Sequence, residues 1–230
     1  MNTRLSFILG AAIALSSTAA IASIHGPHFE EDDDAGSLPE DSKKLYGDGQ
    51  LLTIQGALTG GSRGQGDYQD MYQVYIAQPG EFQLRVADAS FGFDTQLFLF
   101  DLEGRGMLAN NDSIIDGQES LLSLLMNHST DGTNVVVQTP GLYYIAISGF
   151  SSRPMSQNGN IFFFNPETPF EVSGPDGQGG NAPITGWNHP GDTGGYFISL
   201  SGVNFIPVPA PGALALLGLA GLAGRRRRRC

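Results

Sequence analysis

The residues most able to do chemistry are oxygen-bearing side chains crowded between positions 94 and 116. They are all Asp or Asn: Asp94, Asp101, Asn110, Asn111, Asp112 and Asp116. Ca²⁺ takes about six to eight oxygen ligands at about 2.3–2.6 Å, and backbone carbonyls can complete such a set. The grouping therefore predicts a calcium site. Asp and Asn also form β-turns by bonding their own backbone, and no EF-hand spacing occurs, so turn formation is the alternative reading.

The case for catalysis is weak at the level of motifs. The chain has no H-E-x-x-H zinc motif and no P-loop, and its four histidines are isolated: His25, His28, His128 and His189. We therefore expect no enzymatic activity. A Ser/His/Asp site or a carboxylate pair that only folding assembles would leave no spacing in the sequence, so an unrecognised secreted hydrolase stays as an alternative.

Short strands are the elements expected to position these residues. Between Gln50 and Ser201, segments rich in aromatic and β-branched residues are separated by turn signals such as Pro79-Gly80 and Pro140-Gly141. This pattern predicts a single all-β domain, an antiparallel β-sandwich. The expected strands are 51–58, 71–77, 81–87, 96–101, 135–138, 142–148, 161–164 and 196–200. Residues 120–126 suit a short helix as well as a strand.

Two of these segments, 97–100 and 143–147, are apolar on both faces, which is typical of central strands. The core is expected to include Val74, Ile76, Leu84, Val86, Leu97, Leu99, Tyr144 and Ile145.

The first residues have the order of a secretory signal peptide. Arg4 precedes an apolar run over 5–15, and small residues end in Ala20-Ile21-Ala22. The run is about half the ~20 residues that a membrane-spanning helix needs. We therefore expect residues 1–22 to be a signal peptide, with signal peptidase recognising Ala20 and Ala22.

The last residues predict a linker, a membrane segment and a stop. Residues 203–211 form a proline linker, 212–224 an uncharged apolar helix, and 225–230 an arginine-rich end. At about 1.5 Å per residue the helix is short for a ~30 Å hydrocarbon core. Arginines stay on the cytoplasmic side of a membrane, which would leave the domain outside.

This tail resembles the PEP-CTERM sorting signal of Gram-negative bacteria. The resemblance rests on Val208, Pro209, Pro211, Arg225, Arg226, Arg227, Arg228 and Arg229, with Ala210 where the family usually has Glu. It implies removal of the tail by an exosortase-type enzyme after transient anchoring in the inner membrane.

The net charge limits which partners the protein can bind, and the position of the cysteine decides whether a disulfide is expected. The signal segment holds one arginine and the tail five of the 12 basic residues, whereas all 23 acidic residues lie between them, so processing would change the formal charge from −11 to −17. Such a surface cannot neutralise phosphates, which excludes nucleic acid as a partner. The one cysteine, Cys230, lies in the tail, so no disulfide is expected in the domain.

Two segments of the middle are polar. Residues 23–44 carry a run of five acidic residues and predict a mobile leader before a domain over 45–202.

Residues 174–195 are rich in glycine and contain Trp187 and His189, and they predict a long loop. A loop of that length is functional or mobile in most domains, so it is a candidate binding surface, with a disordered insertion as the alternative.

The central region, residues 34–165, resembles the bacterial pre-peptidase C-terminal domain. The resemblance rests on four segments of the chain: Asp34-Ala35-Gly36-Ser37-Leu38-Pro39, Asp67-Tyr68-Gln69-Asp70-Met71-Tyr72, Phe93–Asp101 with Gly104 and Ala109–Asp112, and Pro140–Gly149. It implies a jelly-roll-like β-sandwich without an active site.

Together these patterns predict a non-catalytic exported protein of the cell surface or extracellular matrix, with calcium as its one expected cofactor and extracellular polysaccharide as a possible partner. The alternative of another class is a carbohydrate-binding or adhesive module that uses Trp187, Tyr196 and the glycine-rich loop as an aromatic platform. Core packing is the other explanation for those two aromatic residues.

Overall fold

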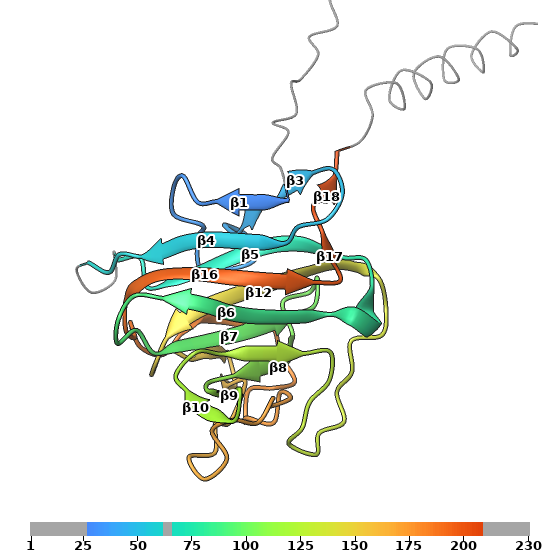
Figure 1. Ribbon diagram of the computed structural model, residues 1–230. Coiled ribbons are helices and arrows are strands. Elements are labelled where there is room, and N and C mark those ends of the chain that lie inside the picture. Colours follow the sequence, from blue (N-terminus) through green and yellow to red (C-terminus); the bar gives the residue numbers. More distant parts are fainter. Residues whose placement is uncertain (1–26, 62–65, 209–230) are drawn as a thin grey trace, which may run out of the picture. The chain divides into compact units, whose positions relative to one another are not determined.

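The computed structural model describes residues 27–61 and 66–208, which form an all-β fold of sandwich-like sheets (Figure 1). The sequence prediction of an all-β sandwich is confirmed. The strands are β1 (His28–Glu30), β2 (Lys43–Lys44), β3 (Tyr46–Gly47), β4 (Thr53–Leu58), β5 (Gln69–Ile76), β6 (Gln83–Ala89), β7 (Thr95–Phe100), β8 (Gly106–Asn110), β9 (Ser113–Ile115), β10 (Gln118–Ser120), β11 (Leu124–Met126), β12 (Gly141–Gly149), β13 (Pro154–Ser156), β14 (Gly159–Asn160), β15 (Ile184–Trp187), β16 (Gly194–Ser201), β17 (Val203–Asn204) and β18 (Ile206–Pro207), and a 3₁₀ turn covers Pro79–Glu81.

Two sheets make the sandwich. The first has the order β1-β4-β16-β6-β11, and the second has the order β17-β5-β12-β7-β8 with β2 beside β5. Neighbours along these two paths are antiparallel, except for β1 on β4; β2 also lies parallel to β5. In Figure 1, β4, β16 and β6 lie in front of β5, β12 and β7.

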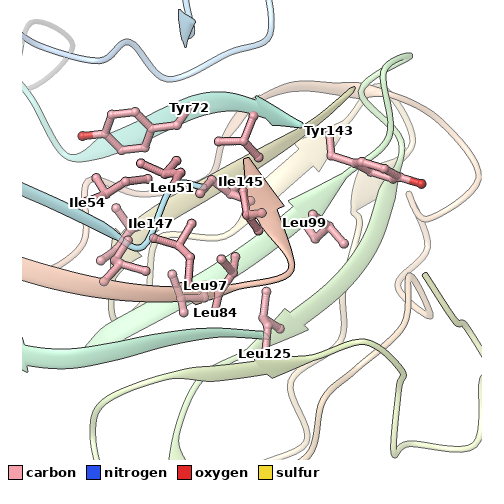
Figure 2. Packing of buried hydrophobic residues seen from close by; sticks show 14 of the residues in the cluster. Leu51, Ile54, Tyr72, Leu84, Leu97, Leu99, Leu125, Tyr143, Ile145 and Ile147 are labelled. Atoms are coloured by element: carbon pink, nitrogen blue, oxygen red, sulfur yellow. The ribbon is translucent and has the colours of Figure 1, made fainter. Parts of the chain in front are cut away.

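The main core lies between these sheets. Strand alternation points every second side chain inward, and Figure 2 shows Leu84, Leu97, Leu99 and Ile145 converging from both sheets. All eight residues expected in the core are buried. Seven of them belong to this cluster, whereas Tyr144 faces the other side of its sheet.

A second apolar cluster covers the outer face of the second sheet. Leu97 and Leu99 of β7 point into the main core, so Phe98 and Phe100 point the opposite way and pack against Phe162. Ile161, Ile184 and Trp187, which follow β12 in the chain, belong to the same cluster. Every residue of β7 is therefore buried, which explains its apolar character on both faces.

The glycine-rich stretch is part of this cover. It contains β15, which pairs with β13, and its backbone runs so close to its neighbours that a Cβ on Gly180 would lie 1.9 Å from the carbonyl oxygen of Pro175. A Cβ on Gly177 would lie 2.3 Å from the carbonyl oxygen of Asn160. The glycines thus serve close backbone packing.

Several expected elements are corrected. Residues 135–138 and 161–164 pack as irregular cover and are not strands. Residues 120–126 suited a helix or a strand, and the structure shows the strand: the last residue of β10 and all of β11 lie there. The predicted mobile leader was wrong for residues 28–44: β1 and β2 lie there, and Phe29 and Ala35 belong to the main core. Two apolar side chains among many acidic ones were too few to signal this from sequence.

The predicted signal peptide and most of the sorting tail, including Ala20, Ala22, Pro209, Pro211 and the five arginines, lie outside the described residues. Val208, the last described residue, is 41% exposed. Within 27–61 and 66–208, no helix has the length and apolar character needed to cross a membrane.

Replacing Leu99 with Ala should lower the free energy of unfolding by about 2–5 kcal/mol, because it leaves a cavity in a packed core. Leu99 is 0% exposed. Urea unfolding at a fixed calcium concentration measures the change. Leu102→Ala, at a position that is 48% exposed, is the matched control and should change it by no more than about 0.5 kcal/mol. Equal losses in the two variants would contradict the assigned core.

Candidate metal centre

Four of the six residues expected to bind calcium have local structural roles. Asp101 Oδ1 accepts the Arg105 backbone N–H at 2.7 Å in the β7–β8 turn. Asp116, with φ of 53°, forms the β9–β10 turn together with Gly117. Asn110 Nδ2 donates to the carbonyls of Asp112 and Glu171, and the side-chain amides of Asn111 and Gln96 hydrogen-bond each other at 2.7 Å.

The remaining two, Asp94 and Asp112, come near one another. Each has a buried carboxylate oxygen without a hydrogen-bond partner. Burial, followed by the charges of Asp112 and Asp192, raises the pKa of Asp94 to about 7. No third carboxylate joins the pair within metal-ligand distance in the described part of the chain. Calcium at residues 94–116 stays a prediction.

The structure gathers a different set of carboxylates at one end of β4 and β5. We call Glu31, Asp34, Asp67 and Asp70 the acidic cluster. Oxygens of Asp34, Asp67 and Asp70 all lie within 4.8 Å of one another. Glu31 lies close enough for its charge to raise the pKa of Asp70. Glu31 and Asp34 follow β1, whereas Asp67 precedes β5 and Asp70 lies inside it.

Asp70 is the innermost member. It occupies an inward position of β5, on the same face as Tyr72, Val74 and Ile76, and is 0% exposed. Its Oδ2 accepts a hydrogen bond from the Tyr196 hydroxyl at 2.6 Å, whereas its buried Oδ1 has no donor. A carboxylate removed from water needs both oxygens satisfied or its charge neutralised.

Two tyrosines form the floor of the cluster. The hydroxyls of Tyr72 and Tyr196 are 2.6 Å apart. Since Tyr196 donates its proton to Asp70, Tyr72 donates to Tyr196. Burial raises the pKa of both hydroxyls above the usual value, so they remain protonated donors.

Glu31 connects the N-terminal segment to the first sheet. Its Oε1 accepts the Ala35 N–H at 3.1 Å and its Oε2 accepts the Ala57 N–H of β4 at 3.0 Å. Gly56 is required beside it, because a Cβ there would lie 2.5 Å from Glu31 Oε2 and 2.4 Å from the Tyr196 hydroxyl oxygen. The backbone thus leaves space for a carboxylate at this point.

The outer members are held by turns. Asp67 Oδ2 accepts the N–H and hydroxyl of Thr59 at 2.8 and 2.9 Å, while its buried Oδ1 has no partner. Asp34 Oδ1 accepts the Gly36 N–H at 2.8 Å. A groove of about 560 Å³, lined by Glu31, Asp34, Thr59 and Asp67, among others, leads to solvent.

The acidic cluster lacks a neutralising charge in the part of the chain that the structure describes. Burial, and then the charges of Glu31, Asp67 and Asp34, raise the pKa of Asp70 to about 8. The pKa of Glu31 is raised mainly by burial. The nearby cation, Lys43, pairs instead with Asp32 and Asp33. Hard oxygen ligands without a protein cation suit Ca²⁺ or Mg²⁺ in preference to a soft transition metal.

The sequence contained one signal for this site. In a strand that alternates inward and outward, Asp70 falls in the inward series with Tyr72, Val74 and Ile76. A carboxylate in a core series needs a partner of opposite charge. The family resemblance includes Asp67 and Asp70 without assigning them a metal, and the acidic run at residues 30–34 predicted a mobile leader.

The aromatic platform expected at Trp187 and Tyr196 is not assembled. Tyr196 is 3% exposed and points into the acidic cluster. Trp187 Nε1 donates to the Ser37 carbonyl at 2.8 Å, and its ring meets the Phe98 ring edge-on with centroids 5.3 Å apart. Both side chains therefore serve packing.

A G-x-S-x-G spacing at residues 60–64 lies between β4 and β5. That motif places a nucleophile at a strand-to-helix junction. Residues 59–61 and 66–68, which flank the part outside the described residues, are not helical. The surroundings therefore do not match that junction.

Comparison with known protein families matches no family model, and comparison with curated proteins returns no significant match. The function is therefore argued from the geometry of the acidic cluster.

The raised pKa of Asp94 predicts that the stability of the fold depends on pH. A carboxyl whose pKa is raised from 3.8 to about 7 in the fold contributes stability that is fully present below the lower value. This contribution is lost as the pH rises through the folded-state pKa of about 7. Asp94→Asn should therefore be more stabilising, or less destabilising, at pH 8 than at pH 4. Urea unfolding at both pH values in chelator tests this.

Asp88→Asn, at an exposed position, is the control and should shift stability equally at both pH values. The same behaviour in Asp94→Asn would contradict the burial argument.

Proposed function

We propose that the chain is a non-catalytic exported module of the cell surface or extracellular matrix whose β-sandwich is completed by a calcium-class divalent cation in the acidic cluster. The observation that carries this proposal is Asp70, which is fully buried, has one carboxylate oxygen without a donor, and offers an oxygen within 4.8 Å of oxygens of Asp34 and Asp67.

A cation relieves more of the cost than a proton does. A proton on Asp70 neutralises that group alone, but Asp67 Oδ1 is also buried without a partner, and Asp34 lies within the same group. Several carboxylates held together repel one another, and a divalent cation between them removes this repulsion. Asp34, Asp67 and Asp70 would hold the ion, with Glu31 beside them.

Calcium is favoured over magnesium by the ligand chemistry. Mg²⁺ retains several waters and binds through one or two carboxylates, whereas Ca²⁺ accepts a larger set of protein oxygens in flexible geometry. Extracellular calcium sites have dissociation constants of about 10⁻⁴–10⁻³ M, which matches a site open to an external medium.

The ligands come from two parts of the chain, and this gives the cation a structural task. Asp34 lies in the segment after β1, whereas Asp67 and Asp70 belong to β5 and its approach. β1 itself has only three residues and pairs with β4 alone. A bound ion would thus fasten the N-terminal segment to the sandwich, as a disulfide does in other exported domains.

The wider assignment rests on the two ends of the sequence. We infer export by signal peptidase, transient membrane anchoring, removal of the tail by an exosortase-type enzyme, and a jelly-roll arrangement of the sandwich. A matrix position would bring the module into contact with extracellular polysaccharide. The acidic composition and the cation site support an external location.

Intact-mass measurement of the native envelope protein tests the processing. We expect a chain that begins after Ala22 and lacks Arg225–Arg229. A mass that retains both ends would contradict export and sorting.

Thermal unfolding with calcium tests the site. If the ion binds only the folded chain, a hundredfold excess over the dissociation constant should add about 2.7 kcal/mol of stability. Chelator should reverse this gain. Asp70→Asn and Asp67→Asn should abolish the response. In chelator at a pH above the raised pKa of Asp70, about 8, Asp70→Asn should be at least as stable as the wild type, because the wild type then buries a charge at this position.

Two controls sharpen the result. Asp94→Asn and Asp112→Asn should leave the calcium response intact if the acidic cluster is the site, and should blunt it if residues 94–116 bind the ion. Magnesium at equal ionic strength separates a shaped site from general screening of an acidic surface. Equal stabilisation by calcium and magnesium would refute the proposal, and so would no stabilisation by either ion.

A further inference from the structure

The β6–β7 turn presents a phenylalanine entirely to solvent. Phe91 is 108% exposed, the highest value among the exposed large hydrophobic residues of the described chain. Isolated apolar side chains on a surface are common, so the exposure of Phe91 alone does not identify a site. It leaves the ring free to pack against a partner outside the chain.

The turn that carries Phe91 is held firmly. Ser90 N–H donates to the Gly195 carbonyl, the Gly195 N–H donates to Ser90 Oγ, and the Phe93 N–H donates to the Ser90 carbonyl, all at 2.9 Å. Phe93 is 4% exposed and anchors the turn in the main core. Phe91 is thus displayed on a fixed support, which lowers the entropic cost of binding.

A groove of about 490 Å³ lies beside this turn. Besides Phe91, its lining includes Tyr68, Asp192, Thr193 and Gly60. The far wall is also fixed, because Gln69 Nε2 donates to the carbonyls of His189 and Pro190, just before it in the chain. Asp192 and Thr193 are exposed and offer a carboxylate and a hydroxyl to a ligand.

The chemistry of this groove fits a sugar polymer without charge. Aromatic rings such as Phe91 and Tyr68 pack on the C–H faces of sugar rings, and a carboxylate accepts hydrogen bonds from sugar hydroxyls. Among the described residues, the charged side chain that lines the groove is Asp192. Its carboxylate would repel anionic polymers and anionic lipid headgroups.

We propose that the groove between Phe91, Tyr68 and Asp192 binds a neutral polysaccharide chain. This site lies apart from the Trp187 and Tyr196 pair that the sequence suggested, and it does not depend on a cation in the acidic cluster.

Affinity electrophoresis in gels containing soluble neutral polysaccharides tests the proposal. Galactomannan, xyloglucan, mixed-linkage glucan and dextran are the probes, in calcium-containing buffer. At least one should retard the domain, and Phe91→Ala should weaken that binding by about tenfold or more. Asp192→Ala should weaken it as well. Phe163→Ala, which removes a ring that is 56% exposed outside the groove, is the matched control and should bind like the wild type.

Three results would overturn the proposal. They are no retardation in any of the four polysaccharides, retardation that Phe91→Ala leaves unchanged, and Phe91-dependent co-sedimentation with phosphatidylcholine vesicles in place of polysaccharide binding. A further check by gel filtration shows whether Phe91 instead joins two copies of the chain, which would also contradict it.

Discussion

Burying a carboxylate costs several kcal/mol unless its charge is compensated, and the N-terminal third of this domain is arranged around one such group. Asp70 lies in the core series of β5 and receives one hydrogen bond, from Tyr196. Beside Asp70, Glu31 accepts the Ala57 N–H of β4, and Gly56 leaves the room that the Glu31 carboxylate needs. Asp70 thus joins β5 to β16, and Glu31 joins the segment after β1 to β4.

The same constraint explains why an acidic segment is ordered. Residues 30–34 would repel one another in a free chain. In the fold, Lys43 pairs with Asp32 and Asp33, Glu31 and Asp34 accept backbone N–H groups, and Ala35 is buried. A cation held between this segment and β5 would complete the arrangement, and its removal should be felt first at the N-terminal edge.

The second sheet is covered on both faces by apolar side chains, so neither of its faces is open to a ligand. The chain after β12 packs Phe162, Ile184 and Trp187 on its outer face, so the glycine-rich stretch acts as a structural layer. The described residues that follow β4, β6 and β15 carry the open groove and the exposed Phe91. Binding is therefore expected at these loops.

The local sequence was sufficient to identify the all-β class, the central strands β7 and β12, and core residues such as Leu99 and Ile145. Short aromatic and β-branched segments between turn signals, and segments that are apolar on both faces, are local properties of strands. The short strands β1, β2 and β3 carried no such pattern, since their stability comes from neighbours distant in the chain. The candidate site likewise has one feature visible in the sequence and one that depends on distant neighbours. The composition shows many hard oxygen ligands, but Asp34 and Asp70 are 36 positions apart and come together through the parallel pairing of β1 with β4 and of β2 with β5. The spacing of residues along a chain reports turns and strands, whereas the distance between two carboxylates depends on how the strands pair, and only the tertiary structure decides that.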